Sequence, residues 1–600
     1  MRRTRLARAA AESAAASASC TSLPRKARIA IIGAGPSGFY AASRILSRIP
    51  YSSGDVLASQ SVHIDIFDRL PVPHGLVRYG VAPDHPDVKN VEHKFASVAQ
   101  DPRIRFAGNV NVVHSSGDES QNIPYPEAVQ VPLQVLSRYY THILFSYGAS
   151  TGRSLHIPGS APGELAGVYT ALQFVNWYNG HPASHDRVLL ADSRFHVDLS
   201  NKHHMSVIGA GNVALDVARI VLRSSTPFLD SAERVTSNKA PGLAALEETD
   251  VPEPVLAELA RCKVQHVDLF ARRGPAQLAF TNKEVREMLS LQGIALQPLE
   301  KELLDSALHQ LEQLASKATC DPASANQIAS EVRVKKRLLS LLAKGSKTKA
   351  DVGADVKTWA LNVFRSPAKF SPKQDGSNQV ASIECNVTSL QSGQPTSRNL
   401  DAADPRKAAW GSGSTDAVSP ASTWMATGQT VSTATDMVVS SVGYQSEPLF
   451  SPSTASTQQS CNAVVQEGRL VQLPFDNARR IVPNLGGRII DPSNQSTIPG
   501  AYVSGWLAHG AQGVIATTMI DAYSVADMIV SDLHAPSRVS KHETLVGADL
   551  LDTLRNESSR PVVGFDDWHK IDHEEKRRGA KLGKIREKVL TVGEMLDIIN

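Results

Sequence analysis

A first glycine-rich turn has the spacing G-x-G-x-x-G that binds the pyrophosphate of a dinucleotide, in the sequence Gly33-Ala34-Gly35-Pro36-Ser37-Gly38. Gly33 permits the tight turn, Gly35 lets the backbone approach the pyrophosphate, and Gly38 lets a helix pack close to the preceding strand. The pattern alone is weak evidence, because many glycine turns are only turns. Here an apolar strand over 29–32 precedes the turn and a predicted helix over 40–46 follows it, so the helix amino terminus faces the phosphates.

A second turn of the same kind has the pattern G-x-G-x-x-A, in the sequence Gly209-Ala210-Gly211-Asn212-Val213-Ala214. A predicted strand over 206–208 precedes it and a predicted helix over 215–222 follows it. Two such turns, each between a strand and a helix, indicate two nucleotide sites in one chain. A third glycine, Gly513, precedes a predicted helix over 519–533 and marks another position that suits an anion or a flat ring.

Charged residues at strand ends indicate which nucleotides these turns bind. Asp68 ends the strand predicted over 62–68, where an acid hydrogen-bonds an adenosine ribose hydroxyl, although its distance from Gly33 exceeds the usual ~20 residues. The alternative is an ordinary strand-end acid. Arg272 and Arg273 end a strand predicted over 267–271, and two guanidinium groups there suit the 2′-phosphate of NADP. The alternative is a solvated arginine pair.

The remaining elements read as an alternation of strands and helices with one long polar segment. Residues 73–86 are rich in Gly and Pro and also carry His, Arg and Asp, which predicts a functional loop rather than a helix. Residues 368–436 predict short β-hairpins with a disordered insertion near 391–421. Further strands are predicted from 105 and over 141–148, 437–443 and 500–505, and further helices over 88–99, 283–291 and 332–342.

Composition excludes several classes of protein. The chain is 42% hydrophobic and 20% charged, which is typical of a soluble globular protein with two or more domains, and its net charge of +3 is too small to indicate nucleic-acid binding. The sequence contains no apolar run of about 18 residues, so no transmembrane helix is predicted. Five cysteines without a C-x-x-C pattern argue against a disulfide framework, a zinc site, an iron–sulfur cluster and a redox-active dithiol: Cys20, Cys262, Cys320, Cys385 and Cys461.

The first 28 residues differ from the rest of the chain. They contain seven basic residues and one acidic residue, Glu12, among many Ala and Ser. This composition predicts a mitochondrial transit peptide, and the alternative is a disordered basic tail that carries no targeting signal.

Several sequence blocks together resemble the adrenodoxin reductase family of mitochondrial ferredoxin–NADP reductases. They lie in the family's order and cover the chain from about Arg28 to its end: 33–40, 74–86, 211–219, 272–275, 280–288, 364–367, 513–519, 565–568 and 594–596. The chain departs from the family in its long Ser/Thr-rich insertion. It also departs at 507–512, near the expected flavin pocket, where the family commonly has a Lys or Arg and a Pro.

The resemblance implies an α/β fold with two Rossmann-like dinucleotide-binding domains, the NADP domain being inserted into a discontinuous FAD domain. The expected boundaries are a transit segment at 1–28, the FAD domain at 29–149 and 445–600, and the NADP domain at 150–444. The implied FAD-binding residues are Gly33, Gly35, Ser37, Gly38, Asp68, Leu76, Val112, Trp506, Gly513, Val514 and Ile515. The implied NADP-binding residues are Ala210, Gly211, Asn212, Val213, Arg272, Arg273, Glu284 and Gly513.

The resemblance also implies an activity: FAD takes hydride from NADPH and passes electrons one at a time to an acidic two-iron two-sulfur ferredoxin that serves monooxygenase, iron–sulfur or haem pathways. A side chain at Gly513 would block stacking of the nicotinamide on the flavin. His85 and Asp216 resemble a family pair near the flavin that supports proton or electron transfer. Their structural alternatives are loop bracing for His85 and helix-start capping for Asp216.

Three further arginines match family positions that bind the ferredoxin: Arg286, Arg333 and Arg337. The alternative for such a charge run is a solvated helix face. We expect a monomer in the mitochondrial matrix, with at most peripheral attachment to the inner membrane and without a metal site or nucleic-acid partner. Competing functions are a non-catalytic sensor of NADP(H) and a flavin monooxygenase. A glutamate-synthase-like small subunit would carry amino-terminal cysteine clusters, and a dithiol reductase would carry C-x-x-C.

Overall fold

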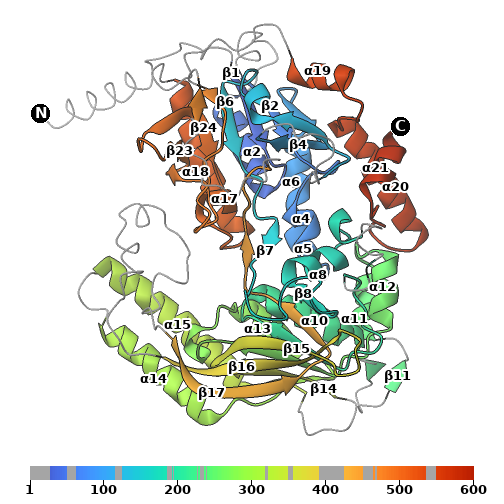
Figure 1. The fold of residues 1–600 in the computed structure, drawn as a ribbon, viewed down its shortest axis with the longest axis vertical. Helices are drawn as coiled ribbons and strands as arrows, with labels where there is room; N and C mark the ends of the chain where they lie inside the picture. Colours follow the sequence, from blue (N-terminus) through green and yellow to red (C-terminus); the bar gives the residue numbers. More distant parts are fainter. Residues whose placement is uncertain are drawn as a thin grey trace, which may run out of the picture.

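The computed structural model describes residues 27–50, 62–114, 125–185, 192, 195–225, 228–229, 235–237, 240–317, 322–348, 356–390, 424–450, 464–466, 469–534 and 549–600. These residues form two domains, one above the other in Figure 1. We call them the upper domain, built on a seven-stranded sheet, and the lower domain, built on a six-stranded parallel sheet.

Strands from both ends of the chain make the upper sheet. Its order is β22 (Asn484–Leu485), β23 (Arg488–Ile490), β24 (Thr497–Val503), β6 (His142–Phe145), β1 (Ala27–Ile32), β2 (Val62–Phe67) and β3 (Ile104–Ala107). The five strands from β24 to β3 run parallel and are mostly buried, as expected for strands covered on both faces. Because β24 pairs directly with β6, the end of the chain completes the domain that the start of the chain begins.

Helices cover one face of the upper sheet. α2 (Pro36–Arg48), α6 (Val91–Val98) and α18 (Ile515–Leu533) pack together there around Phe39, Phe95 and Val525. The other face carries the pair β4 (Val110–Val113) and β5 (Val129–Pro132), with α7 (Leu133–Leu136) and α17 (Trp506–His509). α2 and α18 are therefore packed side by side although they lie near opposite ends of the sequence.

The lower sheet has the order β13 (Ile294–Leu296), β14 (Lys357–Val363), β12 (His266–Ala271), β9 (His204–Ile208), β18 (Met437–Ser440) and β8 (Val168–Thr170). One large core joins this sheet to its helices: α8 (Ala171–Tyr178), α10 (Asn212–Ser225), α11 (Pro241–Glu247), α12 (Glu253–Ala260), α13 (Asn282–Ser290), α14 (Lys301–Lys317) and α15 (Pro322–Lys344). A three-stranded antiparallel sheet packs on the opposite face: β15 (Arg365–Pro372), β16 (Val380–Leu390) and β17 (Trp424–Ala434).

The chain crosses between the domains twice, at neighbouring positions. β7 (Thr151–Gly152) leads from the upper domain to the lower one, and β19 (Tyr444–Gln445) leads back. The two segments pair as antiparallel strands. This arrangement inserts the lower domain into a discontinuous upper domain, so the predicted fold class is confirmed.

The carboxyl-terminal segment ties the domains together. α19 (Leu550–Glu557), α20 (Phe565–Lys581) and α21 (Val592–Ile599) lie along one side of the upper domain in Figure 1. Between α20 and α21, the Nζ atom of the fully buried Lys588 lies 2.8 Å from Oδ2 of Asp250 in the lower domain. Lys89 Nζ, from α5 (Pro86–Lys89), lies 2.8 Å from the same carboxylate. Two cations of the upper domain thus hold one carboxylate of the lower domain.

The structure corrects several predicted elements. The loop predicted over 73–86 contains the short helix α4 (Leu76–Tyr79), because the apolar turn between Gly75 and Gly80 buries Val77 and Tyr79. The helix predicted over 88–99 is divided into α5 and α6, and α14 was not predicted. The expected hairpins form one three-stranded sheet. β1 begins at Ala27, two residues before the predicted strand, so the last two residues of the predicted transit segment belong to the sheet.

Other sequence expectations fall partly outside the described residues. The insertion near 391–421 and residues 1–26 are not among them. Cys262 and Cys385 are the cysteines that the structure describes, and both are unpaired and buried. Burial raises the pKa of the Cys262 thiol to about 11, which agrees with an inert thiol. None of the helices in the described ranges combines the length and apolar character required to span a membrane.

Candidate functional site at the ends of the parallel strands

The first glycine turn opens at the carboxyl end of β1, between β6 and β2. Gly33 has φ +112°, and a Cβ atom there would lie 2.6 Å from Tyr147 Cα, so the position requires glycine. A Cβ atom at Gly38 would lie 2.3 Å from the Gly33 carbonyl oxygen. At Gly35, in contrast, a Cβ atom would meet no described atom within 4 Å. The first and third glycines therefore build the turn, and the second leaves open space beside the start of α2, where a pyrophosphate fits.

The second turn repeats this geometry at the carboxyl end of β9. Gly209 has φ +127°, and a Cβ atom there would lie 2.1 Å from the Ser441 carbonyl oxygen. Around Gly211, the described part of the chain again leaves the space within 4 Å of a Cβ atom empty. Ala214 is fully buried in α10. The two turns, which we call the first cradle (residues 33–38) and the second cradle (residues 209–214), thus have matching shapes. Both lie at strand ends, where open α/β sheets bind nucleotides.

Asp68 braces the first turn. Its carboxylate accepts hydrogen bonds from Ala34 N at 2.8 Å and from Leu70 N at 3.0 Å. Burial raises the pKa of Asp68, and these two backbone hydrogen bonds oppose that shift. The side chain therefore fixes the peptide between Gly33 and Gly35, and its contact with a ribose hydroxyl stays a prediction.

Other predicted FAD-binding residues surround the first turn or the segment before α18. Ser37 Oγ lies 2.6 Å from Ser504 Oγ, which joins the start of α2 to the end of β24. Leu76 lies in α4, next to Gly75, and Val112 is buried in β4. The indole nitrogen of Trp506 is buried without a hydrogen-bond partner among the described residues. A polar atom of a bound cofactor would satisfy it.

Gly513 and its neighbours form the approach to α18. Gly513 has φ +84°, and a Cβ atom there would lie 2.3 Å from Thr517 Oγ1. Val514 is 57% exposed, and Ile515 begins the helix. The backbone conformation at Gly513 therefore disfavours any side chain before contact with a ligand is considered.

The segment 507–512, which departs from the family pattern, contains the end of α17. His509 Nε2 lies 3.9 Å from Asp521 Oδ2 in α18, and Asp521 also accepts a hydrogen bond from Gly505 N. Burial raises the pKa of the Asp521 carboxyl, whereas the charge of His509 and the Gly505 hydrogen bond lower it. A histidine thus lies near the buried acid in a segment where the resemblance leads us to expect Lys or Arg.

Arg272 and Arg273 follow β12 directly and lie beside the second turn. β12 pairs with β9, and Ala279 N donates a hydrogen bond to Ala210 O at 3.1 Å. Thr281 N donates to Asn212 Oδ1 at 2.9 Å, which fixes this side chain at the start of α10. Arg272 is exposed, with its guanidinium carbon 5.9 Å from the centre of the Trp424 ring. Both arginines therefore lie at the edge of the second cradle, as a site for a 2′-phosphate requires.

The predicted pair His85 and Asp216 belongs to a cluster at the junction of the domains. Ligand-type atoms of His85, Asp216 and Glu284 all lie within 4.8 Å of one another. The direct partner of His85, however, is Glu287 on α13, with 2.9 Å between Nε2 and Oε2. Sequence reasoning missed Glu287, although its spacing of three residues from Glu284 places both on one helix face.

Arg219 lies at the centre of this cluster. It donates two hydrogen bonds to Asp84, from Nε at 2.8 Å and from Nη2 at 2.9 Å, and its Nη1 lies 2.8 Å from Asp216 Oδ1. The same Nη1 donates to Glu284 Oε2 at 3.2 Å. Asp84 and His85 come from the upper domain, whereas Arg219 and both acids come from the lower domain. The cluster therefore joins the domains beside the two cradles.

Burial, hydrogen bonds and neighbouring charges shift the pKa values of the titrating groups in this cluster. Burial raises the pKa of Asp216 to about 6, although the charge of Arg219 opposes this shift. The hydrogen bond to Glu287 raises the pKa of His85, whereas burial lowers it. Asp216 is the fifth residue of α10, so the alternative of helix-start capping is wrong. The contact of His85 with Glu287 agrees with loop bracing and leaves the transfer role as a prediction.

We expect Asp216→Asn to stabilise the protein at neutral pH. An acid with a raised pKa binds its proton more tightly in the folded state, so wild-type stability falls as pH rises from about 4 to 6. Asparagine has no proton to lose, so the variant should be more stable by about 1–3 kcal/mol above pH 6 and should lose this advantage near pH 4. Arg219 keeps Asp84 and Glu284 as partners in the variant.

Urea unfolding at four pH values from 4 to 7.5 measures this difference. Asp305→Asn, which alters an exposed aspartate of α14, is the matched control and should shift stability little at any pH. A difference between Asp216→Asn and wild type that stays constant over the whole pH range contradicts the assignment.

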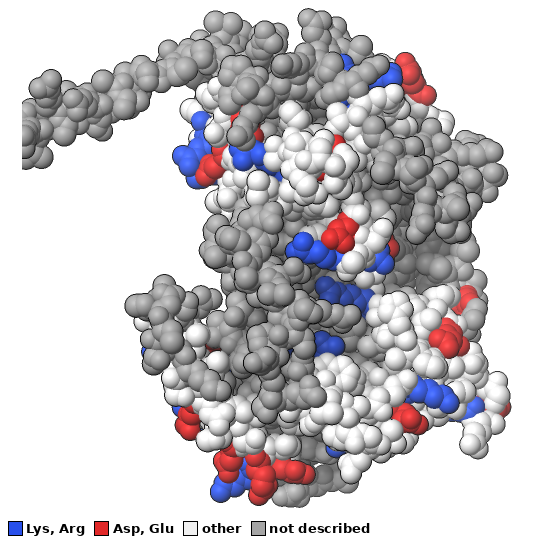
Figure 2. Space-filling view, turned by 60° about the vertical axis from the view of Figure 1, so that its left-hand side comes forward, with Lys and Arg blue, Asp and Glu red and all other residues white. Residues whose placement is uncertain are grey.

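The three predicted docking arginines are exposed on two helices that pack together. Arg286 lies on α13, and Arg333 and Arg337 lie one turn apart on α15. Asn282 Nδ2 at the start of α13 donates to Val334 O on α15 at 3.3 Å. On the face shown in Figure 2, lysine and arginine side chains gather across the middle of the molecule, and acidic side chains are more frequent toward its lower end.

Comparisons with known proteins give a consistent result. No protein-family model matches the chain. The mitochondrial NADPH:adrenodoxin oxidoreductase of Bos taurus is 33% identical over 587 residues, which cover 95% of this chain and 92% of the relative. The mitochondrial NADPH:adrenodoxin oxidoreductase of Arabidopsis thaliana is 30% identical over 577 residues, with 95% of each chain covered. Among solved structures, Mycobacterium tuberculosis FprA in complex with NADPH is 28% identical with a TM-score of 0.68, covering 96% of this chain and all of that one.

Proposed function

Because the chain belongs to the mitochondrial NADPH:adrenodoxin oxidoreductase family, it is an FAD- and NADP-binding oxidoreductase, and we propose that it reduces an acidic two-iron two-sulfur ferredoxin with electrons from NADPH. The ferredoxin would serve a monooxygenase, iron–sulfur or haem pathway. We further propose that the protein acts as a monomer in the mitochondrial matrix, with at most peripheral attachment to the inner membrane.

One observation supports electron transfer within this chain above all others: the second cradle adjoins the same small core as the segment that begins at Gly505, beside Ser37 of the first cradle. Val213 of the second turn and Trp506 and Ala511 of the segment before Gly513 pack against a shared cluster of Ala149, Leu172 and Tyr444. A nucleotide held in each cradle therefore extends toward the same junction. A protein that only bound the two nucleotides separately would not need this shared wall.

The residues of the chain position the reactants. FAD, when bound, supplies the conversion between hydride transfer and single-electron transfer. The open space at Gly35 and Gly211 admits the two pyrophosphates, and Arg272 and Arg273 hold the 2′-phosphate that distinguishes NADPH from NADH. Gly513 leaves the approach to the flavin ring free of a side chain.

We propose that His85 and Asp216 manage protons beside that approach. His85 Nε2 shares a proton with Glu287 Oε2, and Asp216, with a pKa of about 6, gains and loses a proton near neutral pH. Neither group needs to act as a nucleophile. They would take up or release the proton that remains when the two electrons of the hydride pass one at a time to the ferredoxin.

We also propose the boundaries 27–149 and 445–600 for the FAD domain, its start moved from residue 29 to the first residue of β1, and 150–444 for the NADP domain. The pairing of β7 with β19 near both crossings supports them. The transit segment is proposed to end before β1, whose first residue is Ala27.

One experiment tests the proposed function directly. The purified protein should be yellow, and anaerobic NADPH should bleach its flavin absorbance. Cytochrome c reduction by NADPH should be slow without a mitochondrial ferredoxin and fast with one. Binding of NADPH without bleaching would support a redox sensor. Rapid oxygen consumption coupled to substrate hydroxylation would support a flavin monooxygenase.

The docking arginines predict a charge-dependent interaction with the ferredoxin. Arg333→Glu should raise the KM for ferredoxin by about tenfold at low salt, because a negative charge on α15 repels the acidic partner. The increase should fade as salt rises from about 0.05 to 0.5 M and the Debye length shrinks. Arg261→Glu is the matched control, since Arg261 is 62% exposed at the end of α12. Equal effects of the two substitutions, or a KM insensitive to salt, would exclude α15 as the docking surface.

A further inference from the structure

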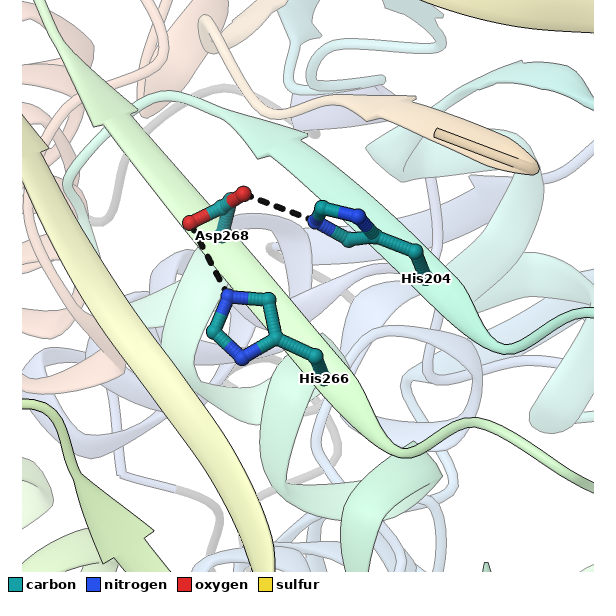
Figure 3. A group of neighbouring side chains, drawn as sticks. All are labelled: His204, His266 and Asp268. Atoms are coloured by element: carbon teal, nitrogen blue, oxygen red, sulfur yellow. Dashed lines mark hydrogen bonds and ion pairs between the residues drawn. The ribbon is translucent and has the colours of Figure 1, made fainter. Parts of the chain in front are cut away.

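Two histidines and one aspartate converge on one face of the lower sheet, away from the nucleotide cradles. His204 is the first residue of β9, His266 is the first residue of β12, and the two are register partners in these parallel strands. Asp268 follows His266 by two residues and therefore points to the same face. Figure 3 shows both imidazole rings directed at the Asp268 carboxylate from the two neighbouring strands.

The distances within this group suit a single small cation. His204 Nε2 lies 2.7 Å from Asp268 Oδ2, and His266 Nε2 lies 3.1 Å from Asp268 Oδ1. The three ligand-type atoms lie within 4.8 Å of one another. The histidine side chains are 28% and 21% exposed, so solvent reaches the group at the amino ends of β9 and β12. Imidazole nitrogen and carboxylate oxygen are ligands that zinc and neighbouring divalent metals accept together.

Surrounding side chains form hydrogen bonds to these residues and orient them, as the hydrogen-bond partners of metal ligands do. Thr358 Oγ1 lies 2.7 Å from His266 Nδ1, which leaves Nε2 of that ring to face the site. Asn362 Nδ2 donates to Asp268 Oδ1 at 2.6 Å. Ser206, the register partner of Asp268 on β9, is fully buried, and its hydroxyl has no hydrogen-bond partner among the described residues. One more oxygen is thus available on the same face.

We propose that His204, His266 and Asp268 bind one divalent transition-metal ion, with zinc the best match and water completing the coordination. The ion takes the place of the hydrogen between each Nε2 atom and the carboxylate, and each neutral ring binds it as the tautomer that carries its hydrogen on Nδ1, where His266 faces Thr358 Oγ1. Binding of the ion links the amino end of β9 to the amino end of β12. The second glycine turn and Arg272 lie at the opposite ends of these strands, roughly 16–20 Å away at ~3.3 Å per residue. The ion should therefore raise stability and leave the KM for NADPH unchanged.

Cobalt titration of the chelator-treated holoenzyme tests the site by its visible absorption, and zinc titration calorimetry gives the stoichiometry. We expect one ion per chain and an increase in melting temperature. His204→Gln and His266→Gln should each weaken binding by about 100-fold or more, and Thr358→Val should weaken it by about 10- to 100-fold, as lost outer partners do. His203→Gln is the matched control, because His203 is the exposed neighbour of His204 and should bind cobalt as wild type does.

Flavin content and circular dichroism show whether each variant is folded, and only folded variants are compared. Loss of binding in the His204 and His266 variants with retention in the His203 variant supports the site. Equal affinity in all these variants, equal loss in the His203 variant, or an absence of saturable cobalt binding by the wild-type holoenzyme below about 1 mM overturns the proposal.

Discussion

Alanine at both Arg272 and Arg273 should raise the KM for NADPH by about 100-fold or more and change the KM for NADH little. Both residues follow β12 and lie at the edge of the second cradle, whose turn is fixed by hydrogen bonds to Ala210 and Asn212. Each charge-assisted hydrogen bond to a phosphate is worth about 1.5–3 kcal/mol, so the pair contributes roughly 3–6 kcal/mol to NADPH binding. Since about 1.4 kcal/mol corresponds to tenfold in affinity, the expected change exceeds two orders of magnitude.

Steady-state reduction of cytochrome c through ferredoxin, measured with both nucleotides, tests this expectation. NADH serves as an internal control, because it lacks the 2′-phosphate and uses the same cradle. Lysine at both positions should give an intermediate KM, since the charge remains but the planar fork of donors is lost. If the double alanine variant raises both KM values equally, the arginines support the turn rather than the phosphate, and an unchanged preference for NADPH would refute their role.

Asp250→Asn should destabilise the protein by about 3–5 kcal/mol, because it removes the carboxylate that the buried Lys588 shares with the partly exposed Lys89. Lys588 is fully buried, and its side chain reaches the Asp250 carboxylate at 2.8 Å and the carbonyl oxygens of Asn179 and Arg78. Lys89 lies 13% exposed on the other side of that carboxylate. Loss of the carboxylate therefore leaves buried positive charge without a counterion at the domain junction.

The dependence on pH gives this prediction a second test. Burial lowers the pKa of Lys588 to about 7, although the charge of Asp250 opposes that shift. Without Asp250, the pKa of Lys588 falls further below its value in the unfolded chain. Folding of the variant must then release a proton, so its stability increases as pH rises. The deficit of the variant should accordingly shrink between pH 6 and 9.

Urea unfolding of the holoenzyme at pH 6 and pH 9 measures both effects. Lys588→Met is the matched control, because it leaves the pair of Asp250 and Lys89 intact and should cost less. A deficit for Asp250→Asn that is no larger than that of Lys588→Met, or that grows with pH, would show that the carboxylate does not compensate the two lysines.

The sequence predicted the parts of the protein that depend on local backbone geometry. Gly33 and Gly209 occupy positive φ angles, and the strand–turn–helix order around each was correctly predicted. A short pattern suffices there, because the turn, the helix amino terminus and the strand end are all made by consecutive residues. The fold class and the family resemblance were confirmed for the same reason, since several such blocks occur in one order.

The candidate site was predicted only in part. The sequence named His85 and Asp216 but missed Glu287, which is the direct partner of His85, and Arg219, which joins Asp216 to Asp84. Asp84 and Arg219 are 135 residues apart, and no periodicity along the chain connects them. The strand-end acid Asp68 was predicted to contact a ribose, and the structure adds its two backbone hydrogen bonds.

The sequence by itself therefore determined where the chain turns tightly enough to hold a pyrophosphate and where apolar strands precede such turns. Only the tertiary structure decided which distant side chains share a site: Lys588 with Asp250, and His204 with His266 and Asp268. The physical reason is that side-chain proximity follows from strand register and domain packing. These depend on burial summed over the whole chain, whereas a glycine turn depends on the φ angles of a few neighbouring residues.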